Sequence, residues 1–327
     1  MTFKLGVGPM SAEIVGIICN YANYYNKELM IIASRNQIDA TSGYVMTTPE
    51  FNAILKTHNT DNIMVCRDHC GPYFLDSEKE LSLAAAMTAT KKTIATDIEH
   101  GFDLIHIDTS RVDDTYGVAE TLIEFALDLN PNIKFEFGTE ENIGVIAGAN
   151  RYTEDVAFAK QFPNMQYVVA QTGSLVKEDY QAGTFNLNIV SGLAQLAEDN
   201  GIGLKEHNAD YLTHEQLSYR KMAKVHAVNI APQLGVIQTK LLHAMSQKYD
   251  LNSEWINFAK VVLDSDKWQK WTHSQNPNTK IAVAGHYCFS SDEYKRLVEK
   301  IDKLSIPNWE TELRIAMTNL FELYTNL

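Results

Sequence analysis

Residues 62–72 read Asn-Ile-Met-Val-Cys-Arg-Asp-His-Cys-Gly-Pro, a short apolar run that ends in Asp68 and His69. The apolar run predicts a buried strand, and the Asp-His pair stands where this strand becomes a loop. In a sheet of parallel strands, that edge carries binding and catalytic groups. A carboxylate there can move a proton while the imidazole holds a cation that polarises a carbonyl. Asp-His pairs are frequent by chance, so the meaning of this one depends on how the other strands end.

The same alternation of an apolar run and an amphipathic stretch occurs eight times along the chain. The predicted strands cover residues 3–8, 29–34, 62–67, 102–108, 133–137, 166–171, 203–207 and 225–230. Helical patterns follow them at residues 12–25, 49–57, 78–100, 118–129, 153–161, 189–200, 214–221 and 234–249. Eight such units predict an α/β protein with a closed (β/α)8 TIM barrel. The alternative is an open doubly wound sheet, which usually has a glycine-rich turn after its first strand; residues 7–11, Val-Gly-Pro-Met-Ser, are not such a turn.

The alternation stops near residue 250. We therefore expect residues 1–250 to form the barrel and residues 251–327 to form a C-terminal helical extension packed on it. Helical patterns in the extension cover residues 253–263, 291–304 and 309–324, around one short apolar run at residues 280–286. Asn276-Pro277-Asn278 predicts an exposed turn.

The composition excludes several classes of protein. Hydrophobic residues make up 45% and charged residues 21% of the 327 residues, which is typical of a soluble globular protein. The formal charge of -13 argues against nucleic acid or an anionic membrane as the main partner. The four cysteines have no zinc-finger spacing and are too few for a disulfide framework. The first residues already show a strand-like pattern and no long apolar segment follows, so we expect no signal peptide, no membrane span and a cytoplasmic location.

Polar or ionisable residues stand at seven of the eight predicted strand ends. These ends are Ser34-Arg35-Asn36-Gln37, Asp68-His69, His106-Ile107-Asp108, Glu136-Phe137-Gly138-Thr139-Glu140, Gln171-Thr172-Gly173, Glu206-His207-Asn208 and Asn229-Ile230-Ala231-Pro232. Such residues are costly in a core and useful in a site. Glu136 carries the most weight, because an unpaired Glu is almost never fully buried. Structural roles are the alternatives for three of the other residues. His106 could equally be a core histidine with its hydrogen bonds satisfied. Arg35 could pair with an acidic residue at the rim of the barrel, and Glu140 could cap the next segment.

The residues at these ends suit a metal site. His69, Glu136 and His207, completed by Gln171 or water, would hold a divalent transition metal ion, with zinc first and manganese, cobalt or nickel as alternatives. An open position on the ion would stabilise an enediolate next to a ketone. The candidate acid/base groups are Asp68, Asp108 and Glu140. The candidate substrate-binding residues are Arg35, Asn36, Gln37, His106, Asp210 and His286.

Several of these motifs together resemble a known family. Arg35-Asn36-Gln37, Gly43-Tyr44, Met46-Thr47-Thr48-Pro49 and Asp68-His69-Cys70-Gly71-Pro72 are similar to motifs of the "non-catalytic" subunit family of class II tagatose-bisphosphate aldolase. Further matches are Ile105-His106-Ile107-Asp108, Gly138-Thr139-Glu140 and the stretch from His207 to Asp210-Tyr211, while Gln171-Thr172-Gly173 approximates a Gln-Pro-Gly strand end. The likeness covers about residues 29–240.

The resemblance implies a barrel with a histidine zinc site, in which Asp68 is the acid/base and His69 the first ligand. It also implies that Glu136 and His207 match the Glu of the fifth strand end and the late histidine. The sequence departs from class II aldolases in having Gln171 where they have His, and it lacks their Gly-Gly-Ser-Gly phosphate loop after His207. The second departure leaves open whether the substrate carries a phosphate.

Three functions follow from the resemblance. The first is an aldolase-type lyase acting on a ketose or ketose phosphate, and the second is a metal-dependent sugar epimerase that uses the same site. The third is a non-catalytic partner subunit of a tagatose-bisphosphate aldolase. The four polar groups Asp68, His69, Glu136 and His207 argue against the third, because a pure partner has no need of them. The expected partners are a small sugar or sugar phosphate and a second copy of the chain or a second aldolase subunit.

Overall fold

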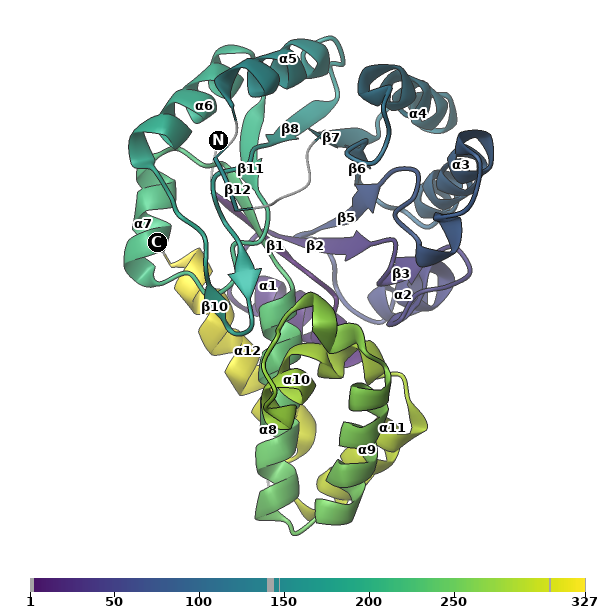
Figure 1. Ribbon diagram of the computed structural model, residues 1–327, viewed down its shortest axis with the longest axis vertical. Helices are drawn as coiled ribbons and strands as arrows, with labels where there is room; N and C mark the ends of the chain where they lie inside the picture. Colours follow the sequence, from purple (N-terminus) through teal and green to yellow (C-terminus); the bar gives the residue numbers. More distant parts are fainter. Residues whose placement is uncertain (1–2, 140–143, 147, 306, 327) are drawn as a thin grey trace.

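The computed structural model describes residues 3–139, 144–146, 148–305 and 307–326. Within these residues, eight parallel strands form a closed barrel in the order β1-β12-β11-β8-β7-β6-β5-β2 (Figure 1). The strands are β1 (Lys4–Val7), β2 (Leu29–Ser34), β5 (Ile63–Cys70), β6 (Leu104–Asp108), β7 (Lys134–Gly138), β8 (Met165–Val169), β11 (Gly203–Glu206) and β12 (Ala227–Ile230). Each of them overlaps a predicted strand, so the predicted (β/α)8 barrel is confirmed.

A helix follows each barrel strand along the chain, and these helices surround the barrel (Figure 1). They are α1 (Ala12–Tyr24), α2 (Thr48–Leu55), α3 (Leu83–Glu99), α4 (Thr115–Leu129), α5 (Ala149–Ala159), α6 (Leu187–Asp199), α7 (His214–Met222) and α8 (Pro232–Lys248). The third helix begins later than predicted, because Ser82 caps it by accepting from the Ala85 amide, and only a short 3-10 turn η1 (Asp76–Glu78) precedes it.

Two short strand pairs lie in loops that follow barrel strands. The pair β3 (Ile38–Asp39) and β4 (Met46–Thr47) comes after β2, and the pair β9 (Val176–Lys177) and β10 (Tyr180–Gln181) comes after β8. Both loops therefore start at the carboxyl ends of the barrel strands, where sites are built in this fold.

The chain after α8 is helical. It contains α9 (Asn252–Asp264), η2 (Lys267–Lys270), α10 (Pro277–Ala284), η3 (Gly285–Cys288), α11 (Asp292–Leu304) and α12 (Trp309–Thr325). In Figure 1, α9, α10 and α11 lie beside the part of α8 that extends beyond the barrel, whereas α12 returns to contact α1 and β1. We keep the division after residue 250 as a proposal.

The turn predicted at Asn276-Pro277-Asn278 is wrong, because these residues start α10. Asn276 is the N-cap, its side chain accepts from the Asn278 amide, and Pro277 occupies the first helical turn. Asn at the cap followed by Pro is a helix-start signal as well as a turn signal. The apolar residues that follow let the helix form.

Part of the barrel interior is filled by apolar side chains, and this leaves the carboxyl ends of the strands for the site. Met30, Ile32, Cys66, Leu104, Tyr167 and Ala227 form a buried cluster of their own inside the barrel. A larger core fills the space between the strands and the surrounding helices. On β5 and β6, Asp68 and His106 lie two residues beyond Cys66 and Leu104, toward the carboxyl ends of the strands.

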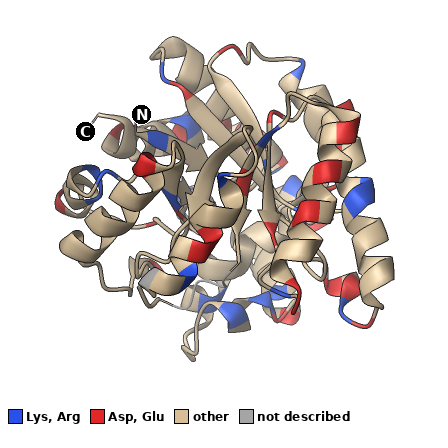
Figure 2. Cartoon of the chain, turned by 90° about the horizontal axis from the view of Figure 1, so that it is seen from above, with Lys and Arg blue, Asp and Glu red and all other residues tan. Residues whose placement is uncertain are grey.

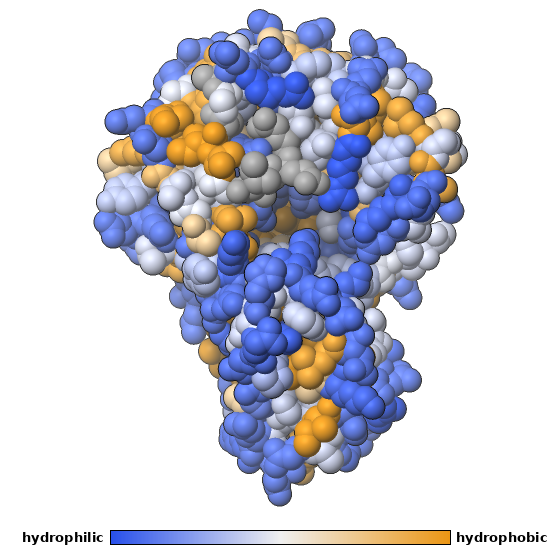
Figure 3. All heavy atoms as spheres, viewed as in Figure 1, coloured by the Kyte–Doolittle hydropathy of each residue, from blue (hydrophilic) through white to orange (hydrophobic). Residues whose placement is uncertain are grey.

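The surface is mainly polar. Lys and Arg are scattered among Asp and Glu in the view of Figure 2, and apolar side chains form separate patches on a largely hydrophilic face in Figure 3. Among the described residues, no helix combines the length and the apolar character that crossing a membrane requires.

Candidate functional site

A β-bulge in β5 brings Asp68 and His69 to the same centre. Adjacent residues of a regular strand point to opposite faces. The register between β5 and β6 shifts between Arg67 and Cys70, so β5 carries one more residue there than its neighbour. His69 has a left-handed backbone with φ of 48°, which is uncommon for a non-glycine residue and is concentrated at functional sites. The bulge therefore lets both side chains face the mouth of the barrel.

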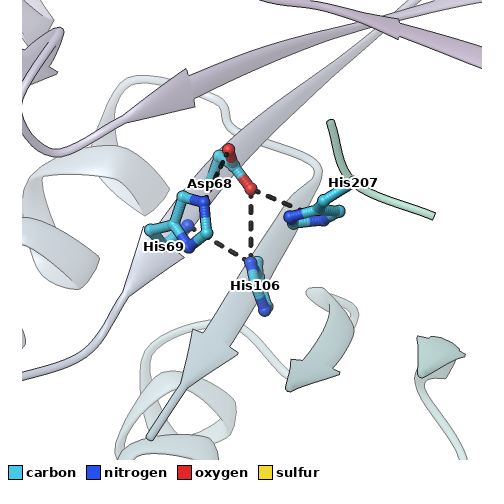
Figure 4. Close-up of side chains that lie close together, drawn as sticks. All are labelled: Asp68, His69, His106 and His207. Carbon is cyan, nitrogen blue, oxygen red and sulfur yellow. Dashed lines mark hydrogen bonds and ion pairs between the residues drawn. The ribbon is translucent and has the colours of Figure 1, made fainter. Parts of the chain in front are cut away.

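Asp68 lies among three imidazoles, those of His69, His106 and His207 (Figure 4). One ligand atom from each of the four side chains lies within 4.8 Å of the others. Asp68 Oδ1 is 3.2 Å from His106 Nδ1 and 3.9 Å from His207 Nε2, and Asp68 Oδ2 is 3.6 Å from His69 Nε2. These residues belong to β5, β6 and the end of β11, so closure of the barrel assembles them. We call this group the Asp68 cluster.

Two further carboxylates orient imidazoles of the Asp68 cluster. Asp108 Oδ2 is 2.6 Å from His69 Nδ1, and Glu136 Oε1 is 2.7 Å from His207 Nε2. A carboxylate bonded to Nδ1 of His69 fixes its tautomer and leaves Nε2 with its lone pair toward the cluster. Asp108 therefore serves the site through His69.

Glu136 is held between a cation and an imidazole. Lys205 Nζ donates to Glu136 Oε2 at 2.5 Å, and both side chains are only 1% exposed. Burial disfavours the charged carboxylate, but Lys205, His106 and His207 lower the pKa of Glu136 to about 2. Burial likewise disfavours the ammonium, yet Glu136 raises the pKa of Lys205 above its ordinary value. Glu136 therefore stays ionised at neutral pH and fixes His207.

The charges of the Asp68 cluster stabilise one another. Burial favours the neutral acid, but His69, His207 and His106 hold the pKa of Asp68 well below its usual range. Burial at the mouth also favours a neutral His69, yet Asp68 and Asp108 outweigh it and raise the pKa of His69 to about 9. The His69 side chain is 39% exposed. A positive charge is thus favoured next to Asp68, at a point that solvent reaches.

Two glycines allow the strand ends to approach one another. A Cβ on Gly71 would lie 1.7 Å from the Asp108 carbonyl oxygen, and a Cβ on Gly138 would lie 2.9 Å from His106 Nε2. Only glycine fits the first position, since the atom it meets belongs to the backbone. These glycines let the loop after β5 pack on β6, and they leave room for the His106 ring.

Three predicted substrate-binding residues are used within the protein itself. Arg35 is buried and donates to Glu78 Oε1 at 2.6 Å and to the Gly71 carbonyl at 2.8 Å. Asn36 is exposed, but its amide donates to the Phe74 carbonyl. Gln37 is buried and accepts from the Ser34 amide. The rim pairing, which was the alternative for Arg35, is what the structure shows, and all three residues shape the loop after β2.

The other predicted residues lie in different surroundings. Asp210 is fully buried and accepts from the Ala231 and Gln233 amides. His286 is also buried, 4.1 Å from the Tyr287 ring, and burial lowers its pKa to about 3. Gln171 is buried just past β8, and its role as a ligand stays a prediction. Glu140 lies outside the described residues.

Lys205 was not predicted as a site residue, and the predicted role of His106 differs from its position in the structure. Lys205 precedes His207 by two residues, so the two share one face of the predicted strand. A lysine on the inward face of a barrel strand was a signal for a buried partner. His106 was expected to bind substrate, whereas the structure puts its Nδ1 beside Asp68. The His69, Glu136, His207 and Gln171 set expected for the metal thus differs from the group that converges around Asp68.

The Asp68 cluster fits a divalent transition metal ion by the chemistry of its donors. Imidazole nitrogens are preferred zinc ligands, and catalytic zinc sites usually have three protein ligands and one open position. His69, His106 and His207 supply three imidazoles around Asp68. The nitrogen of His106 that faces Asp68 is Nδ1, which also accepts from the His69 amide at 3.2 Å, while Nε2 lies on the Gly138 side, buried without a hydrogen-bond partner among the described residues.

The charge balance of the site also fits a dication. The carboxylates of Asp68, Asp108 and Glu136 face one buried ammonium, that of Lys205. Two negative charges therefore remain for protonated imidazoles or a divalent ion to balance. Buried charges require such compensation, because desolvation of an unpaired carboxylate is costly.

The sequence comparisons support the family suggested by the motifs. The family described as "D-tagatose-1,6-bisphosphate aldolase subunit GatZ/KbaZ-like" matches residues 10–123, roughly a third of the chain. Comparison with curated proteins gave no match. The resemblance is thus confirmed over the part of the barrel that includes Asp68, His69, His106 and Asp108.

Solved structures with the same fold cover nearly the whole chain. A probable tagatose 6 phosphate kinase from Sinorhizobium meliloti 1021 has a TM-score of 0.84 at 16% identity, over 98% of this chain and 99% of that one. The fructuronate-tagaturonate epimerase UxaE from Cohnella laeviribosi has 0.66 at 9%, over 99% and 81%. The YdjI aldolase from Escherichia coli K12 has 0.51 at 12%, over 92% and 89%. At these identities the likeness shows the fold alone, which is that of aldolase-type and epimerase-type barrels.

Proposed function

We propose that this protein is a metal-dependent enzyme of the class II aldolase type, which breaks or forms a carbon–carbon bond near the carbonyl of a ketose. The observation that carries the proposal is the Asp68 cluster, with three imidazoles around one carboxylate at the carboxyl ends of the strands. The family match over residues 10–123 supports it. The expected ion is zinc, with manganese, cobalt or nickel as alternatives.

The ligands in this proposal are His69, His106 and His207. A divalent ion held by them would supply positive charge that stabilises negative charge developing on the carbonyl oxygen of the substrate. Asp108 bonds Nδ1 of His69 and so leaves Nε2 for the ion, whereas Glu136 contacts Nε2 of His207, the nitrogen that also faces Asp68. Residues that orient ligands in this way commonly change metal affinity by about 10–100-fold when mutated.

Asp68 is the proposed acid/base group. In aldol cleavage, a base takes the proton of the hydroxyl on the β-carbon, the neighbouring carbon–carbon bond breaks, and the electron pair moves toward the carbonyl. Asp68 is ionised and lies within 4 Å of all three imidazoles, so it borders any substrate bound there. The same carboxyl can return the proton to carbon. His69, the most exposed member of the cluster, marks the side from which substrate enters.

Epimerisation is the second candidate, because it needs the same site and the epimerase UxaE shares the fold. An epimerase removes and returns a proton, or breaks and reforms the bond, without releasing fragments. The two reactions differ in their products and not in the residues required. A pure partner subunit, as the family description allows, would have no need of four ionisable side chains in one mouth.

The proposal is tested by incubating the zinc-loaded protein with a panel of ketoses and ketose phosphates. Two smaller products indicate an aldolase, and one isomeric product indicates an epimerase. Loss of either activity in Asp68→Asn, with the zinc retained, would tie the activity to this site. A protein that converts no sugar and co-purifies with a second barrel protein would favour the partner-subunit alternative.

A further inference from the structure

His207 differs from the other imidazoles of the Asp68 cluster in lying just past the end of its strand. His69 and His106 lie within β5 and β6, which pair with neighbouring strands of the barrel. β11 ends at Glu206, one residue before His207. The chain then turns, since Asn208 has a left-handed backbone with φ of 55°. The carbonyl groups of this turn, residues 207–211, need hydrogen-bond donors from elsewhere in the protein, because they lie beyond the strand ladder.

The chain after β8 supplies these donors. Residues 174–183 contain β9 and β10, and we call them the hairpin segment. Ser174 Oγ donates to the His207 carbonyl at 2.6 Å. Gln181 Nε2 donates to the Asn208 carbonyl at 2.9 Å and to the Asp210 carbonyl at 3.0 Å. Two side chains of the hairpin segment therefore hold three carbonyl groups of the turn that carries His207.

The same Gln181 amide closes the hairpin segment on itself. Its Oε1 accepts from the Leu175 amide at 2.5 Å and from the Gly183 amide at 3.4 Å. The Ala182 amide donates to the Leu175 carbonyl at 2.7 Å and closes the same loop. A primary amide has two N–H donors and two acceptor lone pairs. Gln181 uses them in pairs, two inside the hairpin segment and two on the turn at His207, so it couples the position of one to the position of the other.

The tip of the hairpin segment is anchored on the C-terminal extension. The Glu178 amide donates to the Trp271 carbonyl at 3.2 Å. Glu178 Oε1 accepts from the Thr272 hydroxyl at 2.6 Å, and Thr272 is only 4% exposed. These two residues directly follow η2. A continuous set of contacts therefore runs from the C-terminal extension through the hairpin segment to the backbone of His207.

We propose, building on the metal site proposed above, that the hairpin segment positions His207 for the ion and that Gln181 is its main positioning residue. The C-terminal extension takes part in the same site, because Thr272 holds the tip of the hairpin segment. A functional side chain has to be held within about 0.5 Å of its productive position. For His69 and His106 the paired strands provide this precision, and for His207 the hairpin segment provides it.

The first test compares zinc binding to the metal-free wild type, Gln181→Leu and Gln216→Leu by competition with a chelator. Gln216 is the matched control, because it lies in the same stretch between β11 and β12 but caps α7, where its Oε1 accepts from the Thr213 amide at 2.9 Å. We expect Gln181→Leu to weaken zinc binding about 10–100-fold. Gln216→Leu should bind zinc like the wild type, although the lost cap lowers its resistance to urea. Wild-type zinc affinity in a folded Gln181→Leu protein would overturn the proposal.

The second measurement needs no metal. It follows hydrogen exchange of the Ala209 amide, which donates to the Asn229 carbonyl at 2.9 Å, in the metal-free proteins. Gln181→Leu should speed this exchange about tenfold or more relative to Gln216→Leu, because the turn loses two of its donors. Equal exchange in the two variants would contradict the positioning role. A wild type that binds no zinc would contradict the proposed function, and this exchange would then decide whether the hairpin segment holds the turn.

The third measurement tests the contribution of the C-terminal extension. Thr272→Val keeps the shape of the side chain and removes the hydroxyl that holds Glu178. We expect zinc affinity to fall about two- to tenfold, with no further loss when Thr272→Val is added to Gln181→Leu, because both act through the hairpin segment. Wild-type affinity in Thr272→Val, or a fully additive loss in the double variant, would remove the C-terminal extension from the site. If Gln181→Leu does not fold, Gln181→Glu replaces it in all three measurements, since it keeps an acceptor for the hairpin segment and loses the donors to the turn.

Discussion

Two neighbouring residues of β5, Arg67 and Asp68, both bury a charge, but their charges are compensated in opposite ways. Arg67 donates to Asp97 of α3 through Nε at 2.6 Å and Nη2 at 2.7 Å, and to the Ala33 carbonyl at 2.8 Å. Both side chains of this pair are 0% exposed. Asp68 instead faces the imidazoles of the Asp68 cluster, one of which is partly exposed.

The difference separates a structural pair from a reactive one. The partners of Arg67 are the Asp97 carboxylate and backbone carbonyls, and this pair is closed to solvent. The partners of Asp68 are imidazoles, whose protonation and ligation can change at physiological pH. A strand can thus carry a fixed ion pair on its outer face and a site on its inner face, one residue apart.

Replacing Asp68 tests the reactive side of this comparison. Asp68→Asn keeps the size and shape of the side chain, leaves the imidazoles in place and removes the group that accepts the proton. We expect turnover to fall on the order of 10²–10⁴-fold with the fold intact. Turnover and zinc content should be measured on the same sample. A loss of zinc with normal turnover of the loaded fraction would make Asp68 a ligand-orienting group, and a near-normal rate at full zinc content would remove it from the mechanism.

Replacing Asp97 tests the structural side. Asp97→Asn leaves the Arg67 cation buried without its counter-charge, which should cost about 3–5 kcal/mol in the free energy of unfolding. Urea unfolding measures this loss. Turnover of the folded fraction and zinc content should stay at the wild-type values. The comparison fails if Asp97→Asn is as stable as the wild type, or if it loses zinc while folded.

Glu136 links the two kinds of pairing, because it bonds both Lys205 and His207. Glu136→Gln keeps an oxygen for one partner and loses the charge that both partners need. We expect zinc affinity to fall about 10–100-fold, with a smaller effect on turnover at saturating zinc. Competition with a chelator measures the affinity. An unchanged affinity would show that Glu136 serves the fold alone.

Asp210 is another buried carboxylate, and the direction of its pKa shift distinguishes it from Asp68 and Glu136. Burial raises its pKa to about 7 although two backbone amides donate to it. Since the folded pKa exceeds the ordinary value of about 3.9, the native state binds the extra proton and loses stability as pH rises from about 4 to 7. Asp210→Asn does not titrate, so its stability relative to the wild type should rise by up to about 1.4 kcal/mol per pH unit in that window and then level off. A pH-independent difference would contradict the raised pKa.

The barrel could be predicted from sequence because parallel strands are buried on both faces and read as apolar runs between amphipathic helices. The strand ends also pointed to Asp68, His69, Glu136 and His207, and three of these four lie in the Asp68 cluster. The alternation of apolar runs and amphipathic stretches along the chain was sufficient to predict the barrel and these strand ends.

The remaining features depend on contacts that local patterns do not encode. The bulge between Arg67 and Cys70 depends on pairing with β6. Lys205 meets Glu136 across 69 residues of sequence, and Asp210 meets the start of α8 only once β11 and β12 are paired. Arg35 was expected at the mouth, but a loop after β5 supplies Glu78 as its partner. Each of these follows from barrel closure and not from spacing along the chain.

The central claim is that the Asp68 cluster binds a divalent metal ion, and a zinc titration of the metal-free protein tests it most directly. Calorimetry should show about one tightly bound zinc per chain, in line with three imidazoles around an open position. His207→Ala should weaken this binding strongly, whereas Gln171→Ala should weaken it little, because a neutral amide oxygen is a poor zinc ligand. A folded protein that binds no zinc, manganese, cobalt or nickel, or a His207→Ala variant that binds zinc as tightly as the wild type, would contradict the claim.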